Sequence, residues 1–257
     1  MIDFHSHIIF DVDDGAETIE NSIKMILEAE KAGYTDIIAT PHYMEGCYEV
    51  EKDEINKKIQ LINTVLQQNN VNVKVHQGNE VYITNNVVNL INEGIVSTMN
   101  NSRYVLIETP MGEEPLNLIE VIYNVIENGK IPVIAHPERY EFIQKNPNKL
   151  YNLIEQGALF QANIGSIIGL YGKDVKKTVE QLLQNNMIHF IGTDTHRPNS
   201  IYTKIDTAIE ELAQIVSRKK IRELTYENAQ KVLNNEEIEI EEPTEIKTTL
   251  FNKLFKK

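Results

Sequence analysis

Side chains that can bind metal ions recur along this sequence at the ends of short apolar segments that resemble β-strands. Nine of them stand in this position: His5, His7, Asp14, His42, Glu80, Glu108, His136, Asp194 and His196. Imidazole and carboxylate groups without thiolates suit Zn, Mn, Fe and similar divalent ions. Because nine ligands exceed the needs of one ion, the pattern predicts a cluster of two or three ions. Ions about 3.5–4 Å apart hold both the attacking and the leaving oxygen of a phosphoryl group, which favours phosphoester hydrolysis.

The apolar segments recur about every thirty residues, as in repeated strand–helix units. We expect strands at Ile2–Ser6, Asp36–Ala39, Val71–Gln77, Tyr104–Glu108, Ile131–Ala135, Leu159–Ala162 and Ile188–Gly192. Helical periodicity and helix-ending glycines predict helices at Ile19–Lys31, Lys52–Gln68, Pro115–Asn128, Pro147–Gln156, Lys173–Asn185, Lys204–Ser217 and Tyr226–Leu233. Seven strands that alternate with helices favour a closed parallel α/β barrel, with an open doubly wound sheet as the alternative.

The barrel explains how residues so far apart in the sequence would form one site. The carboxyl ends of barrel strands meet at one mouth, where active sites are built. His5 and His7, two residues apart on a strand, point to the same face. A single histidine or glutamate at a strand end is usually an ordinary surface residue, but nine at the same end of successive strands exceed chance. His76 and His189 lie inside predicted strands and are expected to be packed and hydrogen-bonded instead.

Composition limits the class of protein further. The 38 acidic residues outnumber the 25 Lys and Arg and give a net charge of −13, which argues against a nucleic-acid partner. Cys47, as the one cysteine, can form no intramolecular disulfide, which is typical of a reducing compartment. No apolar run reaches transmembrane length, and the amino terminus lacks the pattern of a signal peptide. We therefore expect a cytoplasmic protein.

The surroundings of Cys47 argue against a cysteine-dependent phosphatase. Such an enzyme needs a nucleophilic cysteine, followed by a phosphate-binding loop that an arginine closes. Cys47 is followed instead by an acidic segment, residues 48–53, that contains no arginine. Tyr43, Met44 and Tyr48 are candidates for lining the mouth next to His42, with packing inside the loop as the alternative.

Seven short motifs occur in an order that resembles a known family. They are MIDFHSH (1–7), DVDDG (11–15), ATPH (39–42), GNEV (78–81), IETP (107–110), IAHPERY (134–140) and GTDTH (192–196). Together they resemble the polymerase-and-histidinol-phosphatase (PHP) family, and more narrowly its bacterial capsule and exopolysaccharide tyrosine-protein phosphatases. The resemblance covers residues 1 to 235. It implies a distorted seven-stranded (β/α) barrel with the metal site at the carboxyl ends of the strands.

The same resemblance implies a trinuclear site and assigns its ligands. One ion would take His5, His7 and Asp194 and share Glu80 with a second ion, which adds Glu108 and His136; a third would take Asp14, His42 and His196. Members of this branch prefer manganese, with Zn, Fe, Mg or Co as alternatives. Which of the two glutamates bridges stays open.

Two arginines are candidates for contacting the substrate. Arg139 stands three residues after His136, and a guanidinium there can bind two phosphate oxygens and stabilise transition-state charge. The family uses the corresponding position in this way, and an ion pair with Glu138 or Glu141 is the alternative. Arg197 follows His196 directly and is the second candidate. The family's second arginine usually stands several residues further on, where this chain has Lys204.

The ligand pattern predicts a metal-dependent phosphatase that uses metal-activated hydroxide and forms no covalent intermediate, and the resemblance implies that it is a protein-tyrosine phosphatase acting on phosphotyrosine. The resemblance implies that its partner is a tyrosine kinase controlling capsule or exopolysaccharide synthesis. One alternative is a PHP phosphatase of a small phosphomonoester such as histidinol phosphate, and another is a non-catalytic regulatory module. Association into homo-oligomers stays open.

The last residues differ in composition from the rest of the chain. We expect the catalytic barrel to cover residues 1–235 and a tail, residues 236–257, to be an appendage rather than part of the core. The tail begins with six glutamates at 236–245 and ends in a basic and apolar segment, LFNKLFKK (250–257). Leu250, Phe251, Leu254 and Phe255 would share one face of a helix, which suits contact with an anionic membrane or a protein partner, with a frayed, disordered end as the alternative.

Overall fold

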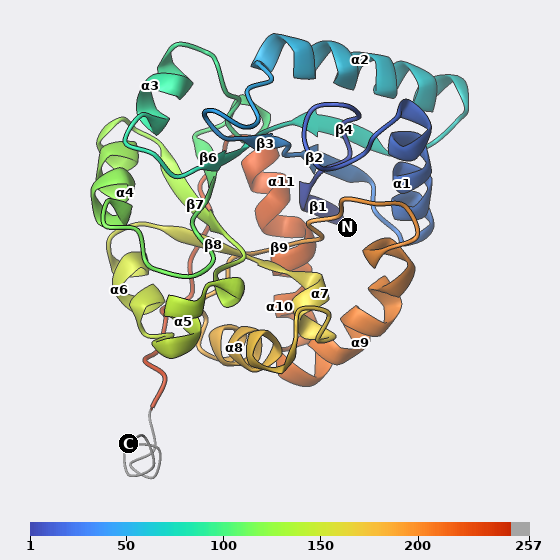
Figure 1. The fold of residues 1–257 in the computed structure, drawn as a ribbon. Helices are drawn as coiled ribbons and strands as arrows, with labels where there is room; N and C mark the ends of the chain where they lie inside the picture. The colour runs from blue at the N-terminus through green and yellow to red at the C-terminus, as the bar shows by residue number, and fades with distance from the viewer. Residues whose placement is uncertain (248–257) are drawn as a thin grey trace.

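Short parallel strands form the centre of the structure, a computed structural model that describes residues 1–247 (Figure 1). The strands are β1 (Ile2–Ser6), β2 (Asp36–Ala39), β3 (His42–Tyr43), β4 (Lys74–Gln77), β5 (Glu80–Tyr82), β6 (Tyr104–Glu108), β7 (Ile131–Ala135), β8 (Leu159–Asn163) and β9 (Phe190–Gly192). They pair in two sheets, in the orders β1-β2-β4 and β3-β5-β6-β7-β8-β9. The apolar and basic segment 250–257 lies outside the described residues.

Two of the predicted strand positions are interrupted. After two residues, β2 continues as β3 and β4 continues as β5, so the segments occupy seven positions around the barrel. Asn79 lies in one interruption, where its side chain donates to the Pro41 carbonyl (3.1 Å) and accepts from the Ser97 N–H (2.8 Å). These bonds satisfy backbone groups that the broken ladder leaves unpaired. Beyond the interruptions, His42 and Glu80 stand opposite each other in register.

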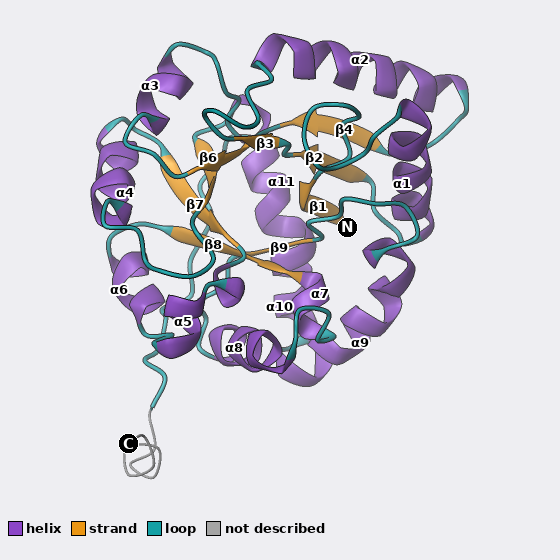
Figure 2. Cartoon of the chain, in the orientation of Figure 1, coloured by secondary structure: helices purple, strands orange, loops and turns teal. Residues whose placement is uncertain are grey.

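The barrel closes where the carboxyl end of β1 meets the chain after β9 (Figure 2). The His7 N–H donates to the Thr195 carbonyl (2.9 Å), and the Asp194 N–H donates to the His5 carbonyl (2.8 Å). The closure is uneven, because the 3₁₀ turn Met99–Asn101 packs against both β4 and β6, which do not pair with each other. The distorted seven-position barrel is therefore confirmed over the open sheet.

Helices pack around the barrel, most of them on its outside (Figures 1 and 2). They are α1 (Ile19–Lys31), α2 (Lys52–Gln68), α3 (Val87–Asn92), α4 (Leu118–Glu127), α5 (Glu141–Lys145), α6 (Lys149–Glu155), α7 (Ile164–Ile167), α8 (Lys173–Gln184), α9 (Ile205–Ile215), α10 (Arg218–Arg222) and α11 (Asn228–Leu233). The bounds predicted for α1 and α2 are confirmed. No prediction covered α3, α5, α7 or α10, because segments shorter than two turns show too little periodicity. Among residues 1–247, no helix has the length and apolar character needed to span a membrane.

The inside of the barrel holds a separate apolar cluster. Phe4 and Phe190 stack there with ring centroids 4.1 Å apart, and Ala229 and Val232 of α11 pack against the same cluster. In Figure 1, α11 lies behind the strands at the centre of the ring. Helix α11 therefore fills the amino-terminal end of the barrel, and the opposite end is left for the polar residues.

The described part of the tail is bound along the barrel and helices. Ile238 is buried within the interior apolar cluster, and the Tyr104 hydroxyl donates to the Glu236 carbonyl (2.8 Å). Further on, the Thr244 N–H donates to the Asn185 carbonyl (3.0 Å). The expectation of an appendage is wrong at Ile238, because an apolar side chain at this point completes the barrel core. The division of the chain at residue 235 stays a prediction.

His76 lies in β4 and His189 directly precedes β9, and both make hydrogen bonds. His76 Nε2 lies 2.8 Å from Asp36 Oδ1. His189 is buried, and its Nδ1 accepts the Phe160 N–H (3.1 Å). Burial, reinforced by the charge of Lys220, lowers the pKa of His189 to about 3.

This pKa predicts an acid-sensitive contribution to stability. In the unfolded chain, His189 binds a proton below the ordinary histidine pKa of about 6.5. In the folded chain it stays neutral until the pH falls to about 3. The free energy of unfolding should therefore fall as the pH drops through this window, by at most about 1.4 kcal/mol per pH unit from this group. Urea denaturation at pH 7 and pH 5 should show a smaller difference for His189→Asn than for the unmodified protein. An equal difference would contradict the assignment.

Candidate metal centre

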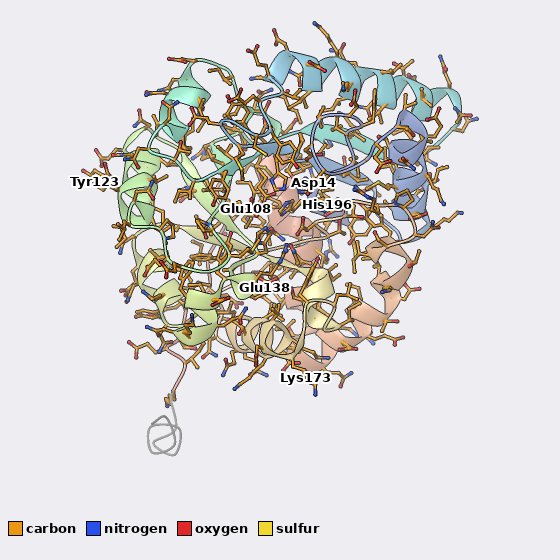
Figure 3. All side chains as sticks on the ribbon, viewed as in Figure 1. Asp14, Glu108, Tyr123, Glu138, Lys173 and His196 are labelled. Carbon is orange, nitrogen blue, oxygen red and sulfur yellow. The ribbon has the colours of Figure 1, made fainter. Side chains whose placement is uncertain are left out.

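All nine side chains singled out in the sequence converge at the mouth of the barrel. The set comprises His5 and His7 from β1, Asp14 from the loop that follows, His42 of β3, Glu80 of β5, Glu108 of β6, His136 after β7, and Asp194 and His196 after β9. Figure 3 shows Asp14, Glu108 and His196 close together at the centre of the ring of helices. The cluster therefore draws on six of the seven strand positions, whose carboxyl ends meet at one mouth of the barrel.

Glu80 lies at the centre of this cluster. Its Oε2 lies 3.2 Å from His5 Nε2, 3.3 Å from His7 Nε2 and 3.1 Å from His42 Nδ1. Its Oε1 lies 3.0 Å from His136 Nε2. One fully buried carboxylate thus contacts four imidazoles, and its position suits a ligand shared between cations.

The other carboxylates surround Glu80. Asp194 Oδ1 lies 3.4 Å from His7 Nε2 and 3.6 Å from His196 Nδ1. Asp14 Oδ1 lies 3.4 Å from His196 Nε2 and 3.6 Å from His42 Nε2. The resulting groups of ligand atoms within 4.8 Å of one another are His5–His7–Glu80, His42–Glu80–Glu108 and His7–Asp14–His42–His196. They overlap, so the geometry suits adjacent cations.

The residues fit divalent ions on two grounds. Glu80 Oε2 and His42 Nδ1 are both buried and lack a hydrogen-bond partner, although they lie only 3.1 Å apart. Buried polar atoms are rarely left without partners, and a cation between them would satisfy both. The donor set of imidazole nitrogen and carboxylate oxygen is the set that Mn, Zn and Fe accept.

Protonation within the cluster follows from the same contacts. Burial opposes a charge on His5, but the carboxylates of Glu80 and Asp194 outweigh it and raise the His5 pKa to about 9. Burial and the charge of Glu80 together raise the pKa of Glu108 to about 8. A protonated imidazole cannot bind a cation, so binding of divalent ions at this cluster should release protons and strengthen as the pH rises.

Close backbone packing holds two of these strands together. A Cβ atom placed on Gly192 would lie 2.7 Å from the His5 Cβ and 2.9 Å from the His5 nitrogen, so only glycine lets β9 approach β1 this closely.

His136 and Asp194 both have left-handed backbones, with φ of 30° and 52°. Such conformations are costly for residues other than glycine and persist where the surrounding structure enforces them, often at functional sites.

Asp13 is a site residue that the sequence reasoning missed. Its Oδ2 lies 2.7 Å from His7 Nδ1 and accepts the His42 N–H (2.9 Å), while Oδ1 accepts the Gly15 N–H (2.9 Å). These bonds orient His7 so that its Nε2 faces Glu80. The DVDDG motif contains the signal, but two adjacent aspartates do not show which one points into the mouth and which one supports it.

A chain of amides on β8 was missed as well. Gln161 Oε1 lies 2.8 Å from His5 Nδ1, Gln161 Nε2 donates to Asn163 Oδ1 (2.9 Å), and Asn163 Nδ2 donates to Asp194 Oδ2 (2.7 Å). Because residues two apart on a strand share a face, both amides point inward. They fix the orientation of His5 and Asp194 relative to each other.

We expect Asp13→Asn to weaken metal binding by roughly 10–100-fold, because the amide cannot accept the His7 N–H with the strength of a carboxylate. Competition with a fluorescent chelator measures this affinity, and Asp11→Asn, an exposed position in the same loop, is the matched control. Unchanged affinity in Asp13→Asn would show that His7 is oriented without it.

Arg139 lies beside the cluster and faces its carboxylates. Its NH1 lies 2.7 Å from Asp194 Oδ2, and its guanidinium covers the ring of Tyr171 at 4.6 Å from the centroid. The alternative partners predicted from the sequence, Glu138 and Glu141, do not pair with it among the described ion pairs. Burial opposes the charge, but Asp194 raises the pKa of Arg139, so the guanidinium stays protonated.

Arg197 has a different environment. Its NH1 donates to the backbone carbonyls of Asp14, Gly15 and His196. About half of the side chain is exposed. These contacts favour a role in holding the loop that carries Asp14, and the phosphate contact predicted for Arg197 stays a prediction.

The aromatic side chains of β3 and of the loop after it divide between core and mouth. The Tyr48 ring stacks on His42, with centroids 5.8 Å apart and planes 15° from parallel. Tyr43 is buried in the apolar layer outside the barrel. Tyr48 is therefore available to a substrate beside His42, whereas Tyr43 is part of the apolar core.

The fold and the site together define a class: a (β/α) barrel with a cluster of histidines and carboxylates for divalent ions at its mouth. The chain belongs to the capsular polysaccharide synthesis family CpsB/CapC, whose model matches residues 1–234. It is 34% identical over 252 residues to the tyrosine-protein phosphatase YwqE of Bacillus subtilis (strain 168), covering 96% of this chain and 97% of YwqE. The resemblance seen in the motifs is thereby confirmed.

Two solved structures bear on the fold. One comes from work on YwqE of Bacillus subtilis and CpsB of Streptococcus pneumoniae, which are described there as unique metal-dependent tyrosine phosphatases. It has a TM-score of 0.90 and 33% identity to this chain, and the match covers 96% of this chain and 100% of that one. Histidinol phosphate phosphatase of Lactococcus lactis has a TM-score of 0.56 and 18% identity, covering 83% of this chain and 92% of its own. The second comparison shows a shared fold.

Proposed function

We propose that this chain is a metal-dependent protein-tyrosine phosphatase of capsule or exopolysaccharide synthesis. The observation that carries the proposal is the convergence of the other eight ligand-type side chains around Glu80 at the barrel mouth. Relatives that match nearly the whole chain are tyrosine-protein phosphatases by name. A complete set of ligand-type side chains also argues against a regulatory module without turnover.

The proposed ligands form three sets that share Glu80 or lie next to it. The first is His5, His7 and Asp194, the second Glu108 and His136, and the third Asp14, His42 and His196. The contacts of Glu80 with four imidazoles support Glu80, rather than Glu108, as the bridging residue. Two or three divalent ions, manganese by preference, would supply Lewis acidity and a bound water of lowered pKa.

The protein's own side chains provide the remaining steps of the proposed mechanism. Arg139 stays charged and would bind two non-bridging oxygens of the phosphoryl group, which carry more charge in the transition state. Asp194 and Tyr171 hold the guanidinium in place. Tyr48 on His42 and Tyr171 on Arg139 offer aromatic faces suited to the phenyl ring of phosphotyrosine.

The proposal extends to a partner and a location. We propose a phosphotyrosine-bearing tyrosine kinase of the cytoplasm as the substrate protein.

Cys47 is exposed and takes no part in the proposed mechanism. Cys47→Ser should therefore keep full activity, which separates this mechanism from that of a cysteine-dependent phosphatase.

The test combines metal content with substrate choice. Elemental analysis of the purified protein, followed by chelation and reconstitution with manganese, should show activity that is lost and regained with the metal. The reconstituted protein should have a higher kcat/KM for a phosphotyrosyl peptide than for histidinol phosphate. The reverse preference would support the small-molecule alternative, and metal binding without turnover of either would support the regulatory one.

A further inference from the structure

Large apolar side chains lie exposed together on the outer face of α4 and on the turn that precedes it. Leu116, Ile119 and Tyr123 have relative exposures of 106%, 57% and 60%. Figure 3 shows Tyr123 at the rim of the molecule, far from Asp14, Glu108 and His196 at its centre. The three residues line a groove of about 630 Å³ that Gln156 also borders. Contiguous exposed apolar surface of this kind marks an interaction site, here separate from the metal centre.

A second groove continues the first toward the start of α6. It has a volume of about 390 Å³, is lined by Lys149 and Leu153 of α6 and by Glu114, and shares Ile119 and Gln156 with the first. We call the two together the α4–α6 groove. Its borders carry four glutamates, Glu114, Glu120, Glu127 and Glu155, against the single lysine Lys149. The surface is therefore apolar in its floor and acidic at its edges.

The described chain ends beside this groove. The Ile246 N–H donates to Asn148 Oδ1 (2.8 Å), and Asn148 Nδ2 donates to the Ile246 carbonyl (3.1 Å). Asn148 directly precedes Lys149, the first residue of α6. Ten residues follow the last described position, and ten residues span up to about 33 Å when extended. A ten-residue helix such as α4 is about 15 Å long, so the whole groove is within reach.

The chemistry of those ten residues complements the groove. They include four large apolar side chains, Leu250, Phe251, Leu254 and Phe255, and three lysines at 253, 256 and 257. We infer that residues 250–257 dock in the α4–α6 groove of their own chain. The apolar side chains cover Leu116, Ile119 and Tyr123, and the lysines face the surrounding glutamates.

Thiol reactivity in the full-length chain tests this docking. Cys47→Ser removes the native thiol, and Tyr123→Cys then places one probe in the groove. Leu61→Cys, at an exposed apolar position on α2, is the matched control. Each probe is combined with the native tail and with Phe251→Ser/Phe255→Ser, and the rate of reaction with a thiol reagent is measured.

We expect the altered tail to raise the rate at Tyr123→Cys about tenfold and to leave the rate at Leu61→Cys unchanged, because a docked segment must open before the reagent enters. Equal rates at Tyr123→Cys with both tails overturn the proposal. Protection that disappears on dilution also overturns it, since the tail would then come from a second copy. If Tyr123→Cys reacts as fast with the native tail as with the altered one, and the protein sediments with anionic vesicles only when it has the native tail, the segment would be assigned to a membrane instead.

Discussion

Glu80→Gln should abolish metal-dependent phosphatase activity while leaving the barrel folded. The carboxylate contacts His5, His7, His42 and His136 within 3.0–3.3 Å, and an amide supplies no negative charge to hold cations among four imidazoles. We expect the metal content to fall and kcat/KM to drop by roughly 10³-fold or more, about 4 kcal/mol of transition-state stabilisation. Elemental analysis and initial rates on a phosphotyrosyl peptide measure the two effects.

Two variants make this result specific. Glu113→Gln, at an exposed position, should change neither metal content nor rate and controls for the loss of one negative charge. Glu108→Gln should lower activity in the same direction, and circular dichroism checks that both site variants are folded. A folded Glu80→Gln protein with full metal content and full turnover would disprove the central position assigned to Glu80.

Arg139→Ala is the second variant expected to have a large effect. It should reduce kcat by roughly 10²–10³-fold, because the guanidinium would no longer stabilise charge on the phosphoryl oxygens in the transition state. Arg139→Lys should recover only part of the loss, since an ammonium cannot make the two parallel bonds of a guanidinium. Single-turnover and steady-state rates on a phosphotyrosyl peptide measure the effect.

The control for Arg139 is an arginine on the other end of the barrel. Arg103 donates to Asn235 near the amino ends of the strands, and Arg103→Ala should leave kcat unchanged. Metal content should stay the same in Arg139→Ala, which separates loss of a phosphate contact from loss of an ion. A kcat within threefold of the unmodified protein would show that Arg139 serves only to pair with Asp194.

Much of the architecture was readable from local patterns. The apolar stripes of α1 and α2 have the helical period over three or more turns, and their bounds were predicted without error. The nine ligand-type residues could be placed together because each lies near the carboxyl end of a predicted strand or in the loop after it, and parallel strands in a barrel bring their carboxyl ends together. A rule that links position in a strand to position in space is enough to locate such residues.

What the sequence by itself determined is therefore the type of fold and the chemical character of the mouth, since both follow from periodicity and from residue type at strand ends. Only the tertiary structure decided that β2 and β4 break so that His42 faces Glu80, that Asp13 supports His7, and that Ile238 joins the core. These features depend on contacts between residues distant in the chain. The local sequence pattern does not show which of two adjacent aspartates contacts a histidine, or which tail residue packs into the barrel. Packing of the whole chain selects those pairs.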